Sequence, residues 1–291
     1  MNKNILKISG VLMSIVFLFA LASISQAKLA ETDKKAVEKY NRYKSEYTQA
    51  VNVYKSMRQD FLTAKDKYLK SKNAENGAAA LQKAKDFLVK ADETMIKYLN
   101  MLKAKAETVA GITESERQQI LNEINSDLAW LEQHKPQIPN ATTKEQLTDH
   151  GKQMQLHWIK VRIHAKRLAG KILIYRINAT IAEGDKIGSD IEARIQKLKD
   201  QGKDTSKLET WLADFENNLN LAKQKRDAAI VKYDQIGTAG ATTLSQLNTE
   251  LEEADALLRD GHNFIKDANQ YVRVAYKDLK DIAKELKTLG A

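Results

Sequence analysis

Three of the five histidines in the sequence recur at seven-residue intervals, at His150, His157 and His164. On a helix, this spacing places the three side chains on one face, with a rise of roughly 10 Å from each to the next. A metal ion binds its ligand atoms at about 2 Å, so these three histidines cannot share one ion. The sequence contains neither HExxH nor ExxH, the helical patterns of zinc proteases and di-iron bundles. We therefore interpret the histidines as a polar flank beside an apolar seam, and we predict no metal site and no cofactor.

Residue patterns for covalent catalysis are also missing from the sequence. There is no cysteine, no GxSxG, no P-loop and no glycine-rich βαβ fingerprint. Carboxylates are plentiful, but they alternate with lysines at helical spacing, which is typical of solvated helix faces. We therefore predict that the protein is not an enzyme.

The strongest charge feature is a basic stretch between Gly151 and Arg176, which holds seven basic residues and no acidic one. Its members are Lys152, Lys160, Arg162, Lys166, Arg167, Lys171 and Arg176. One hypothesis pairs them internally with acidic residues further along the chain, namely Glu250, Glu252, Glu253, Asp255 and Asp260. The other hypothesis is an anionic partner: an envelope polymer, a lipid headgroup surface or nucleic acid. Nucleic acid is the least favoured, because the only aromatic residues among these charges, Trp158 and Tyr175, belong to the apolar seam.

A second candidate surface is a tyrosine seam at heptad spacing, which holds half of the ten tyrosines. Its members are Tyr40, Tyr43, Tyr47, Tyr54 and Tyr68. Such a strip suits a partner groove, because tyrosine combines a large contact area with a polar tip. It equally suits a narrow core whose hydroxyls reach the edge, and we favour the core.

The element that positions the histidines and the basic stretch is a central segment, residues 143–202. Its middle, residues 168–182, is apolar or small on nearly every side, so several neighbours should bury it. Residues 171–177 also have strand propensity. However, the apolar positions of residues 147–182 alternate steps of four and three, which a strand has no reason to keep. We predict a helix whose core includes Leu168, Ile172 and Tyr175, with a kink or a change of packing partner near residues 184–188.

Five further helical segments surround this one. We expect them at about residues 32–72, 78–110, 113–135, 205–236 and 243–289, from their apolar periodicity. Thr113 with Glu116 predicts a capping box, and a second box begins at Thr142 or Thr143. Gly111 is expected to end the second helix, and Pro136 and Pro139 predict a loop.

These elements predict an all-α fold, an elongated antiparallel helical bundle or coiled coil built on one long central helix. We expect two domains. The first, residues 28–182, contains three helices and the first part of the central helix, and the second, residues 183–291, continues as helical hairpins.

The first 27 residues have the pattern of a signal peptide: Lys3 and Lys7, an apolar run at 11–22, and a cleavage signal ending at Ala27. An uncleaved anchor is the alternative, since residues 8–24 are at the short limit for a membrane span. Without cysteine, no disulfide or lipid-modified cysteine is available. We expect an exported chain that is extracellular, periplasmic or attached to the cell surface.

Three functions fit these features. The first is a secreted or envelope-associated, non-catalytic structural or interaction protein that acts through helical faces, with a protein partner or self-association. The second is a module that binds an anionic polymer or a membrane surface through the basic stretch. The third is a periplasmic holdase-like chaperone, which is weakened because no strand segment is present to build an oligomerisation body.

Overall fold

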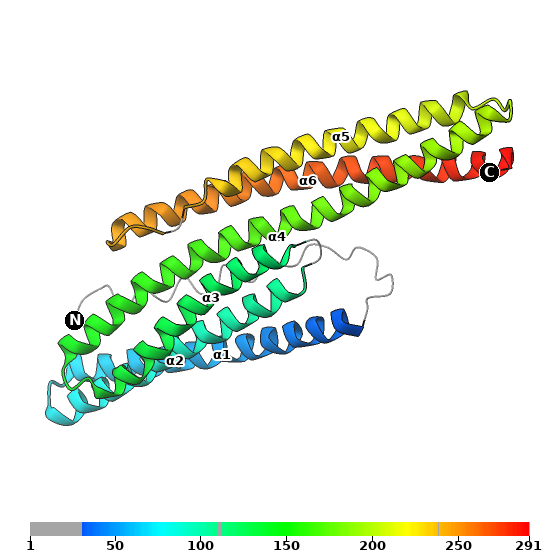
Figure 1. Ribbon diagram of the computed structural model, residues 1–291. Helices are drawn as coiled ribbons and strands as arrows, with labels where there is room; N and C mark the ends of the chain where they lie inside the picture. The colour runs from blue at the N-terminus through cyan, green and yellow to red at the C-terminus, as the bar shows by residue number, and fades with distance from the viewer. Residues whose placement is uncertain (1–30, 110–111, 238, 291) are drawn as a thin grey trace. The chain divides into compact units, whose positions relative to one another are not determined.

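The computed structural model describes residues 31–109, 112–237 and 239–290 (Figure 1). Over these ranges, the chain forms helices and no strand. The helices are α1 (Glu31–Lys70), α2 (Ala74–Glu107), α3 (Glu114–His134), the 3-10 helix η3 (Lys135–Asn140), α4 (Lys144–Asp200), α5 (Ser206–Asp234) and α6 (Leu244–Leu289). The all-α prediction is confirmed, and residues 171–177 lie inside α4, so the strand alternative is wrong. The expected signal peptide, residues 1–27, lies outside the described residues.

Both predicted capping boxes form. The hydroxyl oxygen of Thr113 accepts from the Glu116 amide at 3.2 Å, and the Thr113 amide donates to the Glu116 carboxylate at 2.9 Å. At the start of α4, Thr143 and Gln146 make the same reciprocal pair, at 3.2 Å in each direction. Each box satisfies amides that have no carbonyl partner at a helix N-terminus.

Two predicted boundaries are wrong. The second helix begins at Ala74, because the Asn73 side chain caps it by accepting from the Asn76 amide at 2.8 Å. It ends at Glu107, before Gly111, with Thr108 as its C-cap. The proline-containing segment is not a loop but the 3-10 helix η3, whose short hydrogen-bonded turn tolerates the missing proline amides.

Contacts divide the chain into two compact units. Of the described residues, the N-terminal unit comprises 31–108, 113–165 and 239–249, and the C-terminal unit comprises 109, 112, 166–237 and 250–290. The boundary on α4 falls between residues 165 and 166, whereas the sequence placed it between 182 and 183.

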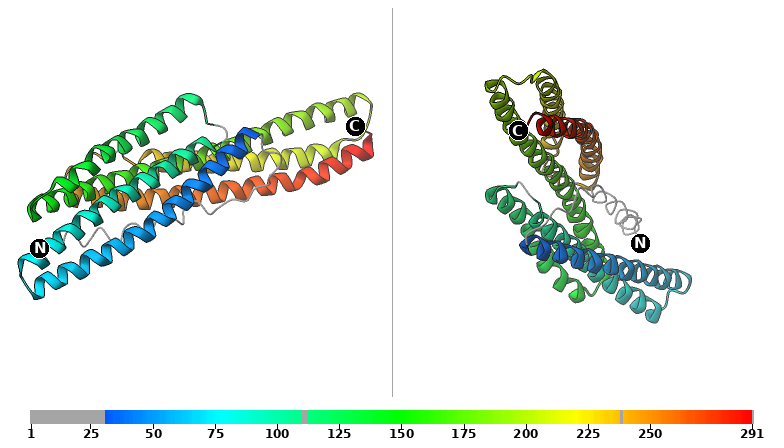
Figure 2. Two further views of the ribbon diagram at one scale, coloured as in Figure 1. Left: turned by 90° about the horizontal axis from the view of Figure 1, so that it is seen from below. Right: turned by 90° about the vertical axis from the view of Figure 1, so that its right-hand side faces the viewer.

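In the N-terminal unit, α1 and α2 lie side by side (Figure 1, Figure 2). Aromatic rings fill their contact: Tyr47 meets Tyr98 at 5.3 Å between centroids, and Phe87 meets Tyr54 at 5.3 Å and Phe61 at 5.7 Å. Burial raises the pKa of Tyr47 and of Tyr54 to about 12. These two tyrosines of the seam belong to the core, as favoured, and the half-buried members are Tyr40, Tyr43 and Tyr68.

In the C-terminal unit, the second part of α4 packs with α5 and α6. Leu168 and Ile172 are buried, as the central-helix pattern predicts, but Tyr175 is only half-buried. A helix of 3.6 residues per turn drifts by about 20° per heptad, so the buried stripe leaves the heptad positions. It passes instead through Ile177 and Ile181, which are both buried.

The two glycines near residues 184–188 accept side chains of α5 within a continuous helix. A Cβ on Gly184 would lie 2.9 Å from the Leu219 side chain, and one on Gly188 would lie 3.4 Å from the Phe215 ring. Both α5 residues belong to a core cluster that also includes Ile191 and Leu198 of α4. The glycines therefore allow close helix packing there.

Candidate functional site

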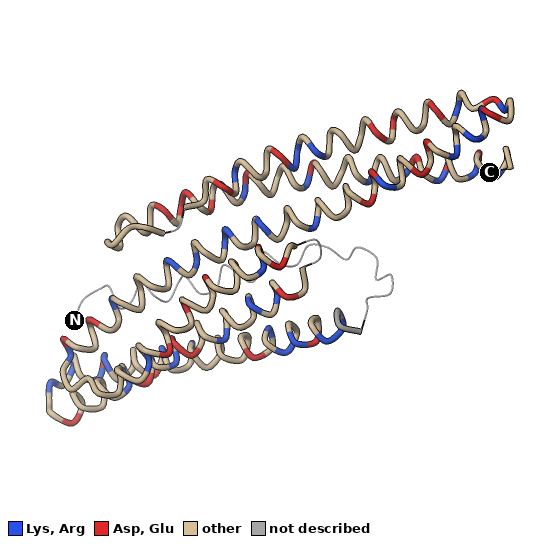
Figure 3. The backbone as a smooth tube through the Cα atoms, viewed as in Figure 1, with Lys and Arg blue, Asp and Glu red and all other residues tan. Residues whose placement is uncertain are grey.

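The basic stretch does not form an exposed strip. Of its seven members only Lys152 is exposed; Arg162 and Lys166 are buried and the other four are half-buried. Lys166 makes an ion pair with Asp255 inside the C-terminal unit, which is one of the internal pairs considered from the sequence. Figure 3 shows the middle of α4 with basic positions and no acidic ones, as the sequence implies.

The other acidic residues considered as partners of the basic stretch do not share the position of Asp255. Asp260 lies 3.8 Å from the ammonium of Lys232, which is outside the basic stretch. Glu252 and Glu253 are exposed on α6. Internal pairing is therefore established for Lys166 with Asp255.

Several titratable side chains contact one another in a histidine–aspartate cluster in the N-terminal unit, between α2, α3 and α4. It consists of Asp92, Asp127, Trp130, His134, His150, His157 and His164. Only the three α4 histidines were singled out from the sequence.

One half of the cluster is a linear relay. The Oδ2 atom of Asp92 lies 2.7 Å from Nδ1 of His134, and these side chains are 0% and 3% exposed. The Nε2 atom of His134 lies 3.1 Å from Nδ1 of His150. Because a carboxylate faces Nδ1 of His134, that nitrogen donates its proton, and Nε2 of a neutral His134 accepts from His150.

The other half is built on one shared carboxylate. The Oδ2 atom of Asp127 lies 3.1 Å from Nδ1 of His164, and its Oδ1 atom lies 3.6 Å from Nε2 of His157. The second distance is too long for a hydrogen bond. The side chains of His157 and His164 are 11% and 25% exposed, so neither is a solvated flank residue.

Trp130 joins the two halves. Its ring stacks on His134 at 4.6 Å and on His157 at 3.9 Å between centroids, with interplanar angles of 15° and 17°. The order of contacts is reversed along the two helices, because His164 meets Asp127 at one end and His150 meets His134 at the other. Thus α3 and α4 pack antiparallel here, and the heptad spacing on α4 matches residues 127, 130 and 134 on α3.

Burial shifts the pKa of three members of the cluster. It lowers the pKa of His157 to about 4, against the opposing effect of the Asp127 carboxylate. Burial also lowers the pKa of His150, and the neighbouring His134 acts in the same direction. The carboxyl of Asp92 has a raised pKa because it is buried, although His134 partly opposes this shift.

The cluster can hold and exchange protons. The three α4 histidines lie half-buried beside the buried apolar seam, and α3 covers them with polar residues of its own, which the sequence did not indicate. Among the described residues, no group of three or more His, Cys, Asp or Glu side chains has a geometry that would hold a metal ion.

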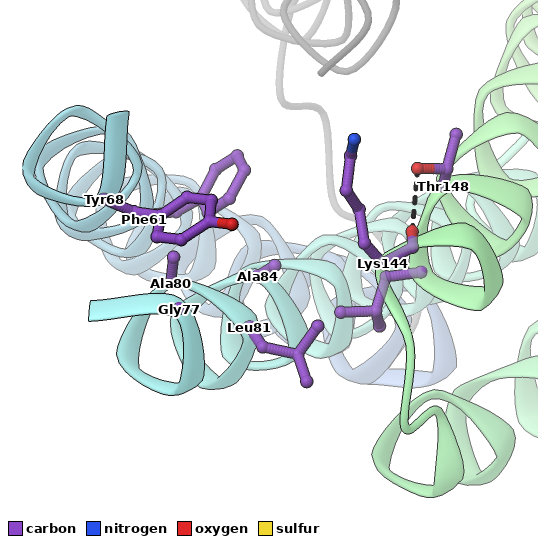
Figure 4. Close-up of a pocket in the computed structure, with 9 residues that line it drawn as sticks. Phe61, Tyr68, Gly77, Ala80, Leu81, Ala84, Lys144 and Thr148 are labelled. Carbon is purple, nitrogen blue, oxygen red and sulfur yellow. Dashed lines mark hydrogen bonds between the residues drawn. The ribbon is translucent and has the colours of Figure 1, made fainter. Parts of the chain in front are cut away.

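A second feature is the end groove of the N-terminal unit, formed by α1, α2 and the start of α4 (Figure 4). The space between its lining residues is about 130 Å³ and is open to solvent on one side. Its lining is Phe61, Tyr68, Gly77, Ala80, Leu81, Ala84, Lys144, Leu147 and Thr148. The Thr148 hydroxyl donates to the Lys144 carbonyl at 2.8 Å, so the remaining polar groups of the groove are the Tyr68 hydroxyl and the Lys144 ammonium.

Comparisons with protein-family models, with curated proteins and with solved structures each found no match to this chain. Within the described part of the chain, no helix combines the length and the apolar character that crossing a membrane requires.

Proposed function

We propose that the protein is an exported, non-catalytic interaction protein that binds a partner protein through the helical faces of its N-terminal unit. The observation that supports this proposal is the end groove. Its occupant is a segment of the partner that inserts an apolar side chain and places a carboxylate beside Lys144.

The groove exists because α2 presents small residues where α1 presents large ones. Gly77, Ala80 and Ala84 follow each other at helical spacing and face the groove together with the rings of Phe61 and Tyr68. Because these three residues have no side chain beyond Cβ, a space of about 130 Å³ remains between them, Leu81 and the two rings. This is smaller than the roughly 300–1,000 Å³ of small-molecule pockets, and it suits a single apolar side chain. Buried apolar anchors of this kind supply most of the affinity at protein interfaces.

The charge at the groove specifies the partner further. Lys144 is exposed, and no carboxylate pairs with its ammonium among the described residues. An acidic side chain on the partner would gain a charge-assisted contact at the rim, which contributes mainly to specificity and association rate. We therefore expect an apolar residue next to an aspartate or glutamate in the partner segment.

The alternative function is binding of an anionic polymer or membrane through the basic stretch. It is less favoured because two of the cations in this stretch are buried. Such binding requires cations that reach a surface, and Arg162 and Lys166 are 7% and 4% exposed. Lys166 also already has an acidic partner in Asp255.

The test is selection of helical peptides from a displayed library on the mature protein, followed by affinity measurements on three variants. Ala84→Trp fills the groove and should abolish binding of the selected peptides. Lys144→Glu should weaken it by roughly tenfold, the effect of about 1.4 kcal/mol. Lys152→Glu is the matched control, an exposed cation on the same helix outside the groove, and should leave binding unchanged.

Selected peptides that bind the Ala84→Trp variant as well as the wild type would contradict the groove as the docking site. Salt-sensitive retention on anionic vesicles that survives Ala84→Trp and is lost on Lys160→Gln with Arg167→Gln would support the polyanion function instead. The proposal keeps the expectation of a cleaved signal peptide and an elongated antiparallel bundle. N-terminal sequencing and small-angle scattering of the secreted protein test these two expectations.

A further inference from the structure

We infer that the histidine–aspartate cluster is a proton-operated switch, which releases the C-terminal half of α3 from α4 when its neutral histidines take up protons. The inference concerns regulation of the N-terminal unit and does not depend on the identity of the partner in the end groove.

The cluster holds four histidines and two aspartates, so two imidazolium ions balance its two carboxylates. A third or fourth proton leaves a net positive charge among largely buried side chains. Burial of an unbalanced charge is strongly unfavourable, so further protonation requires the cluster to open to water.

His150 and His157 are the histidines whose protonation is least favourable while the cluster is closed. His150 contacts His134 directly, ring nitrogen to ring nitrogen at 3.1 Å, so two protonated rings would place like charges in contact. His157 stacks on Trp130 and shares Asp127 with His164, which lies closer to the carboxylate. These two positions are the proton-sensitive ones.

Charged side chains around the cluster also change its net charge. Lys135 of η3 faces Asp92, and Lys160 of α4 faces His157, so both add positive charge at the cluster. Asp149 of α4 faces His150 and favours its protonation. The lowered pKa of both histidines, with burial as the largest cause, agrees with the geometry.

The element that moves is α3. Its buried residues are Ile120, Ile124, Asp127, Leu128, Leu131 and His134. Two of these six side chains are members of the cluster, and both lie in the second half of the helix. The other two buried side chains of this half are Leu128 and Leu131, so the cluster contributes half of them, and its opening removes that share of the packing of the helix.

The direction of the response follows from linkage. A histidine that is kept neutral in the closed cluster, but has an ordinary pKa near 6.5 when open, takes up its proton on opening. The open form therefore gains population as the pH falls below about 6.5, and this gain stops near the low pKa of the closed form. Asp92 acts in the opposite direction, because its raised pKa favours a protonated, closed state in acid.

The experiment is hydrogen exchange of the mature protein at pH 7.5 and pH 5.0, corrected for the intrinsic pH dependence of exchange. We expect the amides of residues 125–134 to exchange at least tenfold faster at pH 5.0, with the amides of α5 unchanged. The double variant His150→Asn with His157→Gln should lose this acceleration. The matched control is His262→Gln, which changes the one histidine outside the cluster and should behave as the wild type.

A second variant keeps the test decisive if the double variant is unstable. Asp127→Asn removes one of the two negative charges, so the exchange transition should move to higher pH. The inference is overturned if α3 is equally protected at both pH values in the wild type. It is also overturned if Asp127→Asn leaves the transition in place or moves it to lower pH.

Discussion

The indole of Trp130 on α3 stacks on the imidazole of His157 on α4, with the ring centroids 3.9 Å apart and the planes inclined by 17°. The same indole also stacks on His134. Through these two contacts, the relay that ends at Asp92 and the pair built on Asp127 become parts of one packed cluster.

Replacing Trp130 by leucine should therefore destabilise the N-terminal unit. Each aromatic stacking contact contributes roughly 0.5–1.5 kcal/mol beyond buried area, so we expect a loss of about 1–3 kcal/mol in the free energy of unfolding. Urea unfolding followed by circular dichroism measures it. Trp211→Leu is the control, because Trp211 is also half-buried and packs against the mainly aliphatic core cluster of the C-terminal unit. An equal loss in both variants would argue against the stacking.

Stability should also depend on pH through His157. The pKa of this residue is about 4 in the folded protein, below the ordinary value, because the side chain is buried. The unfolded chain therefore binds a proton that the folded chain excludes, and stability falls as the pH drops from about 6.5 towards 4 and then levels off. The shift corresponds to a loss on the order of 3 kcal/mol.

Unfolding midpoints at pH 7.5 and pH 4.5 test this expectation. The difference between the two midpoints should shrink in His157→Gln, which removes the titrating group, and should persist in His262→Gln. A full difference in His157→Gln would assign the pH dependence to other groups.

The sequence predicted the elements that depend on local signals. The Thr113–Glu116 capping box and the long apolar periodicity of α4 are properties of neighbouring residues, and both elements form as expected. The start of α2 was misplaced because Gly77 resembled a turn residue, whereas the effective signal was the cap at Asn73. Turn-forming and helix-capping residues lie next to each other here, and the side-chain hydrogen bond of the cap determines where the helix begins.

The candidate site was visible only in part. The heptad of histidines on α4 showed one face of the cluster, but Asp92 and Asp127 come from two other helices, and their register against α4 is a tertiary property. The spacing of Asp127, Trp130 and His134 on α3 was the available signal, since these positions share one helix face. The partner of Lys166 was among five acidic candidates, and nothing in the sequence distinguished Asp255 from the others.

Close packing around Tyr233 yields a further prediction. A Cβ on Gly261 of α6 would lie 2.3 Å from the Tyr233 ring, and a Cβ on Gly170 of α4 would lie 2.5 Å from it. Gly261→Ala should therefore cost roughly 1–3 kcal/mol through overpacking, although alanine is favoured over glycine in a helix by about 1 kcal/mol. Gly188→Ala, where the nearest ring atom is 3.4 Å away, should be neutral or stabilising in the same thermal unfolding measurement. The opposite order would mean that the ring moves aside at no cost.

The ion pair of Lys166 and Asp255 gives the last prediction. The ammonium of Lys166 is buried, whereas the side chain of Asp255 is 45% exposed. Asp255→Asn leaves a buried cation without its partner, so we expect a loss of about 1–3 kcal/mol, less than for a fully buried pair because solvent screens the exposed carboxylate.

Lys166→Met removes the charge and retains most of the apolar stem, and it should be nearly neutral or stabilising. Combining Lys166→Met with Asp255→Asn should then restore stability close to that of Lys166→Met alone, because no unpaired cation remains. Urea unfolding of the two single variants and the double variant gives the coupling directly. Additive losses would contradict the pairing.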